Sequence, residues 1–243
     1  MFLVSLMTRV LAINGSARME KGQTAKMLAV FLQGMEEAGA STEIIYAKRL
    51  KIRPCMGDFQ CWFEKVGECI YSDDMQEVVF PKMREADILV LAIPIYFPFP
   101  GEMQNLLNRL MPLVEPILEF RNGRTRAKFH DNVNISKIAL VSTGGWWEKD
   151  NLSAIVKFAE DFARDASIEF AGSVLRPHAF WMSEEEEKER EVLDATKRAG
   201  FQLVKEGRMT AELLDIISQP LVSENELREW YNAAYGRAKK GLD

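Results

Sequence analysis

The stretch "AINGSARMEKGQTAKM", residues 12–27, contains the transition on which the fold assignment depends. An apolar run ends in a loop with two glycines and two hydroxyl side chains, and a helical pattern follows it. Such a strand–loop–helix unit begins a crossover between parallel strands. In open α/β sheets, ligands bind beyond the carboxyl ends of the strands, where this loop lies. The stretch therefore predicts both an α/β fold and a ligand site.

Short apolar runs alternate with helical patterns over the rest of the first 180 residues. The predicted strands cover residues 9–14, 42–47, 87–94, 136–143 and 168–174. The predicted helices cover residues 22–38, 72–85 with a kink at Pro81, 101–113 and 151–165. Strands that are apolar throughout are typical of a parallel sheet covered on both faces. Five of them, with right-handed crossovers, predict a flavodoxin-like doubly wound sheet of order 2-1-3-4-5.

Composition and charge limit the functions that the chain can have. Its 243 residues are 47% hydrophobic and carry a net charge of −5. After about residue 180 only helical patterns remain, so we divide the chain into a flavodoxin-like domain (1–180) and a helical C-terminal extension (181–243). The first 180 residues carry 22 acidic and 21 basic side chains. Because nucleic-acid phosphates demand a basic face, this balance argues against nucleic acid as a partner.

The C-terminal extension contains two helix-start signals and one apolar stripe. Ser183 with Glu186, and Ser223 with Glu226, each predict a capping box. The stripe at helical spacing consists of Leu227, Trp230, Tyr231 and Ala234. We expect this extension to build an oligomer interface, with packing onto its own domain as the alternative.

No stretch approaches the ~20 apolar residues that a membrane-spanning helix needs. The chain begins with the apolar run "MFLVSLMTRV", which lacks the basic start and small-residue cleavage site of a signal peptide. We therefore expect no membrane partner and a cytoplasmic location. Disulfide bonds are not expected in that compartment.

The loop of residues 15–24 has the chemistry of a small anion site. Ser16 and Thr24 supply hydroxyl donors, Gln23 supplies an amide donor, and Arg18 supplies positive charge. The helix that follows adds unpaired backbone N–H groups. The pattern fits neither the nucleoside-triphosphate loop nor the dinucleotide fingerprint. It therefore suits a single terminal phosphate, with an ordinary turn before a capped helix as the alternative.

Two further loops follow predicted strands and are rich in aromatic residues. The third predicted strand leads into "PIYFPFPGEMQNLLNRL" and the fourth into "STGGWWEKDN". Their ring-bearing residues are Tyr96, Phe97, Phe99, Trp146 and Trp147. Stacking faces beside backbone hydrogen-bonding groups suit a planar ring system with polar edges.

From about residue 8 to residue 177 the chain resembles the flavodoxin-like NAD(P)H-dependent FMN reductases and the related iron-sulfur flavoproteins. The segments that carry the resemblance are "NGSARMEKGQT", "PCMGDFQCWFEKVGECIYSDDM", "ADILVLAIPIYFPFPGEMQNLLNR" and "STGGWW". The family often has Lys and Asp where this chain has Gln104 and Asn108. That departure weakens any charge-based role for the helix predicted over residues 101–113, which follows the loop after the third predicted strand.

The resemblance implies FMN as the cofactor and assigns its contacts. The residues that it implies for the phosphate are Ser16, Arg18, Gln23 and Thr24. For one side of the isoalloxazine ring the resemblance implies Pro94, Ile95, Tyr96 and Phe97. For the other side it implies Thr143, Gly144, Gly145 and Trp146. By analogy with the family we also expect a homodimer or homotetramer.

The three cysteines, Cys55, Cys61 and Cys69, follow the spacing C-x5-C-x7-C, which contains no C-x2-C zinc pair. In the iron-sulfur flavoproteins the matching segment carries four cysteines. This chain has cysteines at three of those positions and Asp58 at the remaining one. We expect a remnant of that segment without metal. The alternative is an iron–sulfur cluster with Asp58 as one ligand.

These observations predict an FMN-dependent oxidoreductase that accepts hydride from NAD(P)H and passes electrons to a quinone, flavin or other small-molecule acceptor. The cofactors perform that chemistry, so we expect no catalytic side chain, and neither histidine has the spacing of a triad or metal site. The alternative is an electron carrier of the iron-sulfur flavoprotein type. The near-neutral first 180 residues argue against the strongly acidic flavodoxin type of carrier. No feature favours a third reading, an FMN-binding sensor or scaffold.

Overall fold

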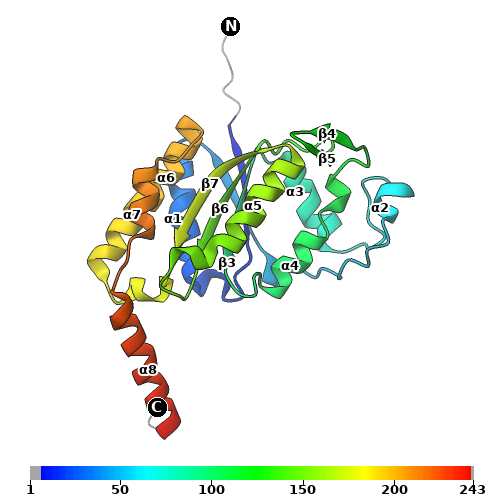
Figure 1. Ribbon diagram of the computed structural model, residues 1–243. Coiled ribbons are helices and arrows are strands. Elements are labelled where there is room, and N and C mark those ends of the chain that lie inside the picture. Colours follow the sequence, from blue (N-terminus) through cyan, green and yellow to red (C-terminus); the bar gives the residue numbers. More distant parts are fainter. Residues whose placement is uncertain (1–6, 242–243) are drawn as a thin grey trace.

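Five apolar segments form a single parallel sheet in the computed structural model, which describes residues 7–241 (Figure 1). The strand order is β2-β1-β3-β6-β7. The strands are β1 (Arg9–Asn14), β2 (Ser41–Tyr46), β3 (Ile88–Pro94), β6 (Lys137–Thr143) and β7 (Glu169–Arg176). These are the five predicted strands, so the predicted flavodoxin-like order is confirmed.

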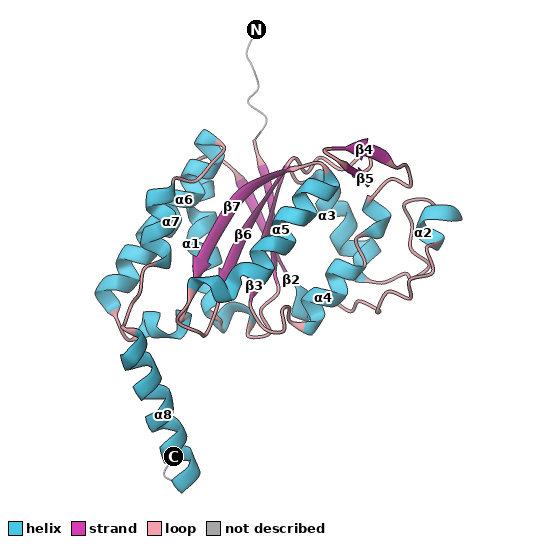
Figure 2. Cartoon of the chain, in the orientation of Figure 1, coloured by secondary structure: helices cyan, strands magenta, loops and turns pink. Residues whose placement is uncertain are grey.

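Helices cover both faces of the sheet, as Figure 2 shows. They are α1 (Gln23–Glu37), α2 (Gln60–Phe63), α3 (Phe80–Glu85), α4 (Gly101–Asn108), α5 (Ser153–Ala166), α6 (Glu186–Glu206), α7 (Ala211–Ser218) and α8 (Glu224–Lys240). Single 3-10 turns are η1 (Met19–Lys21), η2 (Ala47–Arg49), η4 (Met111–Leu113), η5 (Lys149–Leu152) and η6 (Ala179–Ser183).

Two hydrophobic cores result from the alternation of side chains along the strands. Val10 and Ala12 point to the face covered by α1, α6 and α7. Leu11 and Ile13 point to the opposite face, which α3, α4 and α5 cover. Because both faces are buried, the strands need continuous apolar sequence, which is why their positions could be predicted.

Two predicted helices are interrupted at prolines. The helix expected over residues 72–85 begins as a π-helical segment, η3 (Met75–Val79), and becomes α3 beside Pro81. The helix expected over residues 101–113 ends at Asn108 and is followed by η4, in which Pro112 stands in the first turn. Proline lacks the backbone N–H that a continuing helix requires.

A small antiparallel hairpin, β4 (Glu119–Arg121) and β5 (Arg124–Arg126), was not predicted. Its turn is Asn122–Gly123, and both residues have positive φ, 49° and 77°. An Asn-Gly pair in this conformation is typical of two-residue hairpin turns. The sequence therefore contained a signal for this element.

The C-terminal segment divides into two parts. Helices α6 and α7 complete the core on one face of the sheet. A Cβ atom at Gly34 of α1 would lie 1.8 Å from the Lys197 carbonyl oxygen of α6, and one at Gly200 would lie 2.0 Å from that of Phe31. Only glycine permits this close crossing. Helix α8 extends away from the body (Figure 1).

One of the two predicted capping boxes is confirmed. Ser223 and Glu226 form it at the start of α8. The box predicted at Ser183 and Glu186 is wrong, because α6 begins after Glu185, which makes no capping hydrogen bond with its side chain. Ser183 instead ends η6 and accepts a hydrogen bond from Gln23.

Within residues 7–241, no helix combines the length and the apolar character that crossing a bilayer requires. The apolar start of the chain, from which we expected no export signal, falls largely in residues 1–6, outside the described residues.

Candidate functional site

Three loops meet where β1, β3 and β6 end, at the edge of the sheet where the sequence predicts a ligand. The Gly15 backbone N–H donates to the Ala92 carbonyl oxygen over 2.8 Å. The Ile95 N–H donates to the Thr143 carbonyl oxygen over 2.9 Å. The hydroxyl oxygens of Thr24 and Thr143 lie 2.7 Å apart in a buried hydrogen bond. Direct contacts thus link all three predicted loops.

The first loop is a tight turn that leads into the start of α1. The buried Ser16 donates its backbone N–H to Asn14 Oδ1 over 2.8 Å, and its Oγ accepts from the Arg18 N–H over 3.3 Å. Gly22 is the N-cap of α1, and its carbonyl oxygen accepts the Ala25 N–H over 3.0 Å. Because Gly22 has no side chain, the Gln23 and Thr24 N–H groups at the start of α1 have no side-chain cap. A Cβ at Gly22 would lie 2.8 Å from Ser16 Oγ. The turn therefore leaves backbone donors for an anion.

The other two predicted anion ligands lie at the rim of this turn. Arg18 is exposed and forms no ion pair with any other residue in 7–241. Gln23 donates its side-chain N–H to Ser183 Oγ over 3.2 Å, so the C-terminal segment contacts this loop. The Nδ2 of Asn14 is buried beside the turn without a partner among the described residues.

The second and third loops place aromatic rings around four less exposed residues, which form the floor of the site. Pro94 and Ile95 are half-buried and Thr143 and Gly144 are buried. A Cβ at Gly144 would lie 3.2 Å from Leu152 and 3.4 Å from Ile95, so a small residue suits this position. Exposed side chains surround this floor: Tyr96 is 50% exposed, Phe97 is fully exposed, and Trp146 is 61% exposed. The predicted Gly145 is also exposed.

The two adjacent tryptophans have different surroundings. Trp147 donates its indole N–H to the Val222 carbonyl oxygen over 2.9 Å and stacks on His178, with 6.5 Å between ring centroids. Trp146 lies tilted against Tyr231 of α8 at 6.2 Å. A cavity of about 430 Å³ lies between this loop and α8, and Trp146, Trp147 and Tyr231 are among its walls. Trp147 is therefore anchored, whereas Trp146 faces an open space.

Arg176 and His178 form a buried support behind these loops, which the sequence did not indicate. The Arg176 guanidinium donates to the carbonyl oxygens of Pro177, Ile217 and Gln219. Burial lowers its pKa to about 10. Its backbone carbonyl accepts from the Gly144 N–H over 3.0 Å. Arg176 thus ties the end of α7 to the third loop.

His178 is fully buried and neutral in this arrangement. Its Nε2 accepts the Leu221 N–H over 3.0 Å, so the ring proton is on Nδ1. Burial, together with the positive charges of Arg176 and Lys188, lowers the pKa of His178 to about 4. Its role is structural, as the absence of a triad or metal spacing in the sequence suggested.

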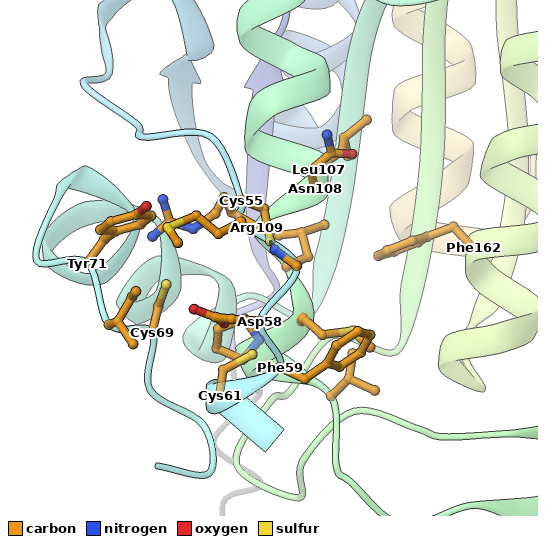
Figure 3. A pocket seen from close by; sticks show the side chains of 17 residues that line it. Cys55, Asp58, Phe59, Cys61, Cys69, Tyr71, Leu107, Asn108, Arg109 and Phe162 are labelled. Atoms are coloured by element: carbon orange, nitrogen blue, oxygen red, sulfur yellow. Dashed lines mark hydrogen bonds between the residues drawn. The ribbon is translucent and has the colours of Figure 1, made fainter. Parts of the chain in front are cut away.

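The cysteine segment surrounds a second cavity, of about 330 Å³ (Figure 3). The walls include all four predicted cluster ligands, Cys55, Asp58, Cys61 and Cys69, together with Arg109 from the end of α4. Burial raises the pKa of the Cys61 thiol, and the nearby Cys69, Cys55 and Asp58 raise it further. Within residues 7–241, no three Cys, His, Asp or Glu side chains are grouped to hold one metal ion.

A buried ion pair holds this segment to the protein body. Arg109 Nη1 lies 2.8 Å from Asp73 Oδ2 and 2.6 Å from the Arg53 carbonyl oxygen. Burial raises the pKa of Asp73, but hydrogen bonds from Arg109 and from the Arg53 and Met75 N–H groups outweigh it, so the pKa is lowered. The Arg109 guanidinium carbon also lies 5.1 Å from the ring centroid of Tyr71.

Comparison with known proteins identifies relatives of the sheet and its loops. Residues 8–147 match the family model described as NADPH-dependent FMN reductase. An iron-sulfur flavoprotein of Methanocaldococcus jannaschii is 34% identical over 106 residues, which are 43% of this chain and 53% of that protein. One of Archaeoglobus fulgidus is 36% identical over 102 residues, 42% of this chain and 48% of that protein. The chain thus spans about half the length of the curated relatives that it matches.

Solved structures with the same fold include an NAD(P)H:quinone oxidoreductase from Methanothermobacter marburgensis. It is 16% identical and matches with a TM-score of 0.56 over 82% of this chain and 97% of its own. At this level of identity the likeness concerns the fold alone, and it agrees with the observed strand order.

Proposed function

The chain belongs to the NADPH-dependent FMN reductase family, and we propose that it is an FMN-dependent oxidoreductase that accepts hydride from NAD(P)H. The electrons then pass to a small acceptor such as a quinone or a free flavin. The observation that carries this proposal is the meeting of three loops at one sheet edge, linked through Thr24, Thr143 and Ile95. That edge combines backbone donors for a phosphate with exposed rings for a planar cofactor.

The first loop has hydrogen-bond donors and a positive charge that suit one phosphate. Ser16 and Thr24 offer hydroxyl groups, the start of α1 offers N–H groups, and Arg18 at the rim offers a positive charge. The contact between Gln23 and Ser183 closes one side of the loop. These features support FMN rather than FAD as the cofactor.

The second and third loops would hold the ring system. The half-buried residues 94–95 and the buried Thr143 and Gly144 offer backbone hydrogen-bonding groups, while Tyr96 and Trp146 offer stacking faces. When bound, FMN supplies the hydride-accepting chemistry. The chain positions the ring and limits the access of water, so no acid or base side chain is needed.

Helix α8 supports a homo-oligomer. It extends from the body and carries large rings that remain accessible, with Trp230 45% and Tyr235 69% exposed. Burying such rings against a second copy would stabilise the assembly by several kcal/mol. Because α6 and α7 belong to the core, the informative truncation ends the chain at Val222. We expect light scattering to show fewer chains per particle for this variant than for the parent. The same number of chains per particle in both proteins would contradict the interface role.

The test of the proposed function is anaerobic bleaching of the bound flavin. The full chain is loaded with FMN or FAD, the bound flavin is released by heat and identified, and NADH and NADPH are added separately. We expect FMN to be retained and bleached by at least one nicotinamide. Predominant FAD, or no bleaching by either nicotinamide, would overturn the proposal, and the latter would favour the electron carrier.

A matched pair of glycine variants ties the result to the first loop. Gly22→Ala puts a methyl group 2.8 Å from the present position of Ser16 Oγ, whereas Gly236→Ala meets nothing within 4 Å. We expect only Gly22→Ala to weaken FMN binding. Equal FMN affinity in both variants would show that this loop does not hold the phosphate.

A further inference from the structure

One wall of the cavity beside the third loop is helix α8, which lies outside residues 8–147, the part of the chain that matches the family model. The cavity has a volume of about 430 Å³, which is within the range of small-molecule sites. The loop contributes Trp146 and Trp147, and α8 contributes Tyr231 and Tyr235. Because Trp146 also borders the predicted ring site, a molecule in this cavity would lie next to that site.

Tyr231 is held in place by its ring and has a free hydrogen-bond donor. The centroid of its ring lies 5.6 Å from that of Phe180, 5.3 Å from that of Trp230 and 6.2 Å from that of Trp146. Its hydroxyl oxygen lies 4.0 Å from the position of a Cβ at Gly145, and none of the described residues forms a hydrogen bond with it. Burial raises the pKa of Tyr231, so the hydroxyl keeps its proton at neutral pH. The cavity thus has a positioned donor that lacks an acceptor.

The charges around the cavity favour a neutral ligand. Arg228 Nη1 lies 3.5 Å from Glu224 Oε1, and both residues line the cavity together with Glu148. An anion would lie near the two carboxylates and a cation would lie near the guanidinium, so each would meet a like charge. The aromatic side chains instead offer flat faces, since Trp146 is 61% and Tyr235 is 69% exposed. The walls therefore suit a neutral planar ring.

We propose that the cavity between the third loop and α8 binds a neutral planar aromatic carbonyl compound, whose oxygen accepts the hydrogen bond of Tyr231. The exposed face of Trp146 stacks on the ring of this ligand. The place of the cavity beside the ring site makes the ligand the electron acceptor, and that assignment rests on the proposed reductase function. A ligand without the carbonyl group leaves the Tyr231 hydroxyl without its partner, so Tyr231 determines specificity.

The test measures the binding of 9-fluorenone and of fluorene, which has the same fused rings without the carbonyl oxygen. Neither compound adds to the thiols of the chain. Each is equilibrated by dialysis against an excess of the full chain, first free of flavin and then saturated with FMN, in the absence of a nicotinamide. We expect 9-fluorenone to bind and FMN to leave its affinity unchanged, because the ring site and the cavity are adjacent but separate.

Two variants and one control assign the contacts. Tyr231→Phe keeps the ring that packs on Phe180 and Trp230 and removes only the hydroxyl. It should weaken 9-fluorenone binding about 2- to 10-fold, the effect of one neutral hydrogen bond, and leave fluorene binding unchanged. Trp146→Ala should weaken the binding of both ligands by a similar factor, because both lose the stacking face. Tyr71→Phe changes a tyrosine that lines the cavity of the cysteine segment and should bind both ligands like the parent.

Circular dichroism, measured for every variant, reports whether the protein is folded. The proposal fails if the folded parent does not bind 9-fluorenone, or if Tyr231→Phe weakens the binding of both ligands equally. Displacement of 9-fluorenone by FMN would place it in the ring site, and displacement by AMP would assign the cavity to the adenine of a nicotinamide cofactor. Either result overturns the proposal. Because no nicotinamide is present, these outcomes are independent of flavin bleaching. Failure of bleaching with 9-fluorenone binding intact would instead refute the proposed function, and with it the role of the ligand as acceptor.

Discussion

Two regions of the molecule carry its candidate chemistry, and they are built in opposite ways. The strand-end loops, residues 15–24, 94–100 and 143–147, follow buried strands and bond to one another through backbone and buried hydroxyl groups. The cysteine segment, residues 51–74, has a single short helix and mostly exposed side chains. It is tied to the body by the buried pair of Arg109 and Asp73. The first region takes its shape from the sheet, and the second depends on a few side-chain contacts.

Breaking the buried ion pair should produce the largest effect. Arg109→Leu leaves the Asp73 carboxylate buried without its main partner, and Asp73→Asn removes the charge that compensates the guanidinium. Each change should lower the free energy of unfolding by ~3–5 kcal/mol, measured by urea denaturation. Arg228→Ala, which removes an exposed helix pair, should cost under about 1 kcal/mol. Equal losses from Arg109→Leu and Arg228→Ala would show that the pair does not hold the segment.

The buried support behind the strand-end loops, Arg176 and His178, should make the free energy of unfolding depend on pH. The folded state keeps His178 neutral with a pKa of about 4, against 6.5 when unfolded. Between these values the unfolded chain binds a proton that the folded chain excludes, so stability falls as pH falls through this window. The loss should reach about 3 kcal/mol at the acid end.

The variant that tests this pH effect is His178→Gln. His178→Gln keeps an acceptor for the Leu221 N–H and removes the titrating group, so its unfolding free energy should change less between pH 6.5 and 4. Identical slopes in the parent and in His178→Gln would mean that other groups cause the acid sensitivity.

The comparison also explains what the sequence could predict. The strand order was predictable because continuous apolar runs such as residues 88–94 are needed where both faces are buried. The strand-end loops followed from that order. Contacts between distant segments were not predictable: two of the carbonyl groups that accept from Arg176 are about 40 residues away. The close crossing at Gly34 and Gly200 leaves no periodic signal, so the place of α6 in the core was missed.

A moderate effect is expected at the rim of the phosphate loop. Arg18→Ala should weaken FMN binding about tenfold or more, since a charge-assisted hydrogen bond contributes ~1.5–3 kcal/mol. Lys21→Ala removes an exposed positive charge from the same loop and is the matched control. Isothermal titration of the FMN-free protein measures both affinities. If Arg18→Ala binds as tightly as the parent while Lys21→Ala does not, the charged contact belongs to Lys21.

The smallest effect concerns Trp146, the exposed member of the tryptophan pair. It contacts Tyr231 of α8 yet remains 61% exposed beside the predicted ring site, whereas Trp147 is anchored by Val222 and His178. Loss of an aromatic stacking face costs ~0.5–1.5 kcal/mol, so Trp146→Ala should slow anaerobic flavin bleaching by about 2- to 10-fold with FMN content unchanged. Trp147→Phe should instead lower stability by about 1 kcal/mol through its lost hydrogen bond and leave bleaching unaltered. A Trp146→Ala protein that bleaches at the parental rate would assign this ring to the packing of α8, and the strand-end loops would then position the flavin by their backbone alone.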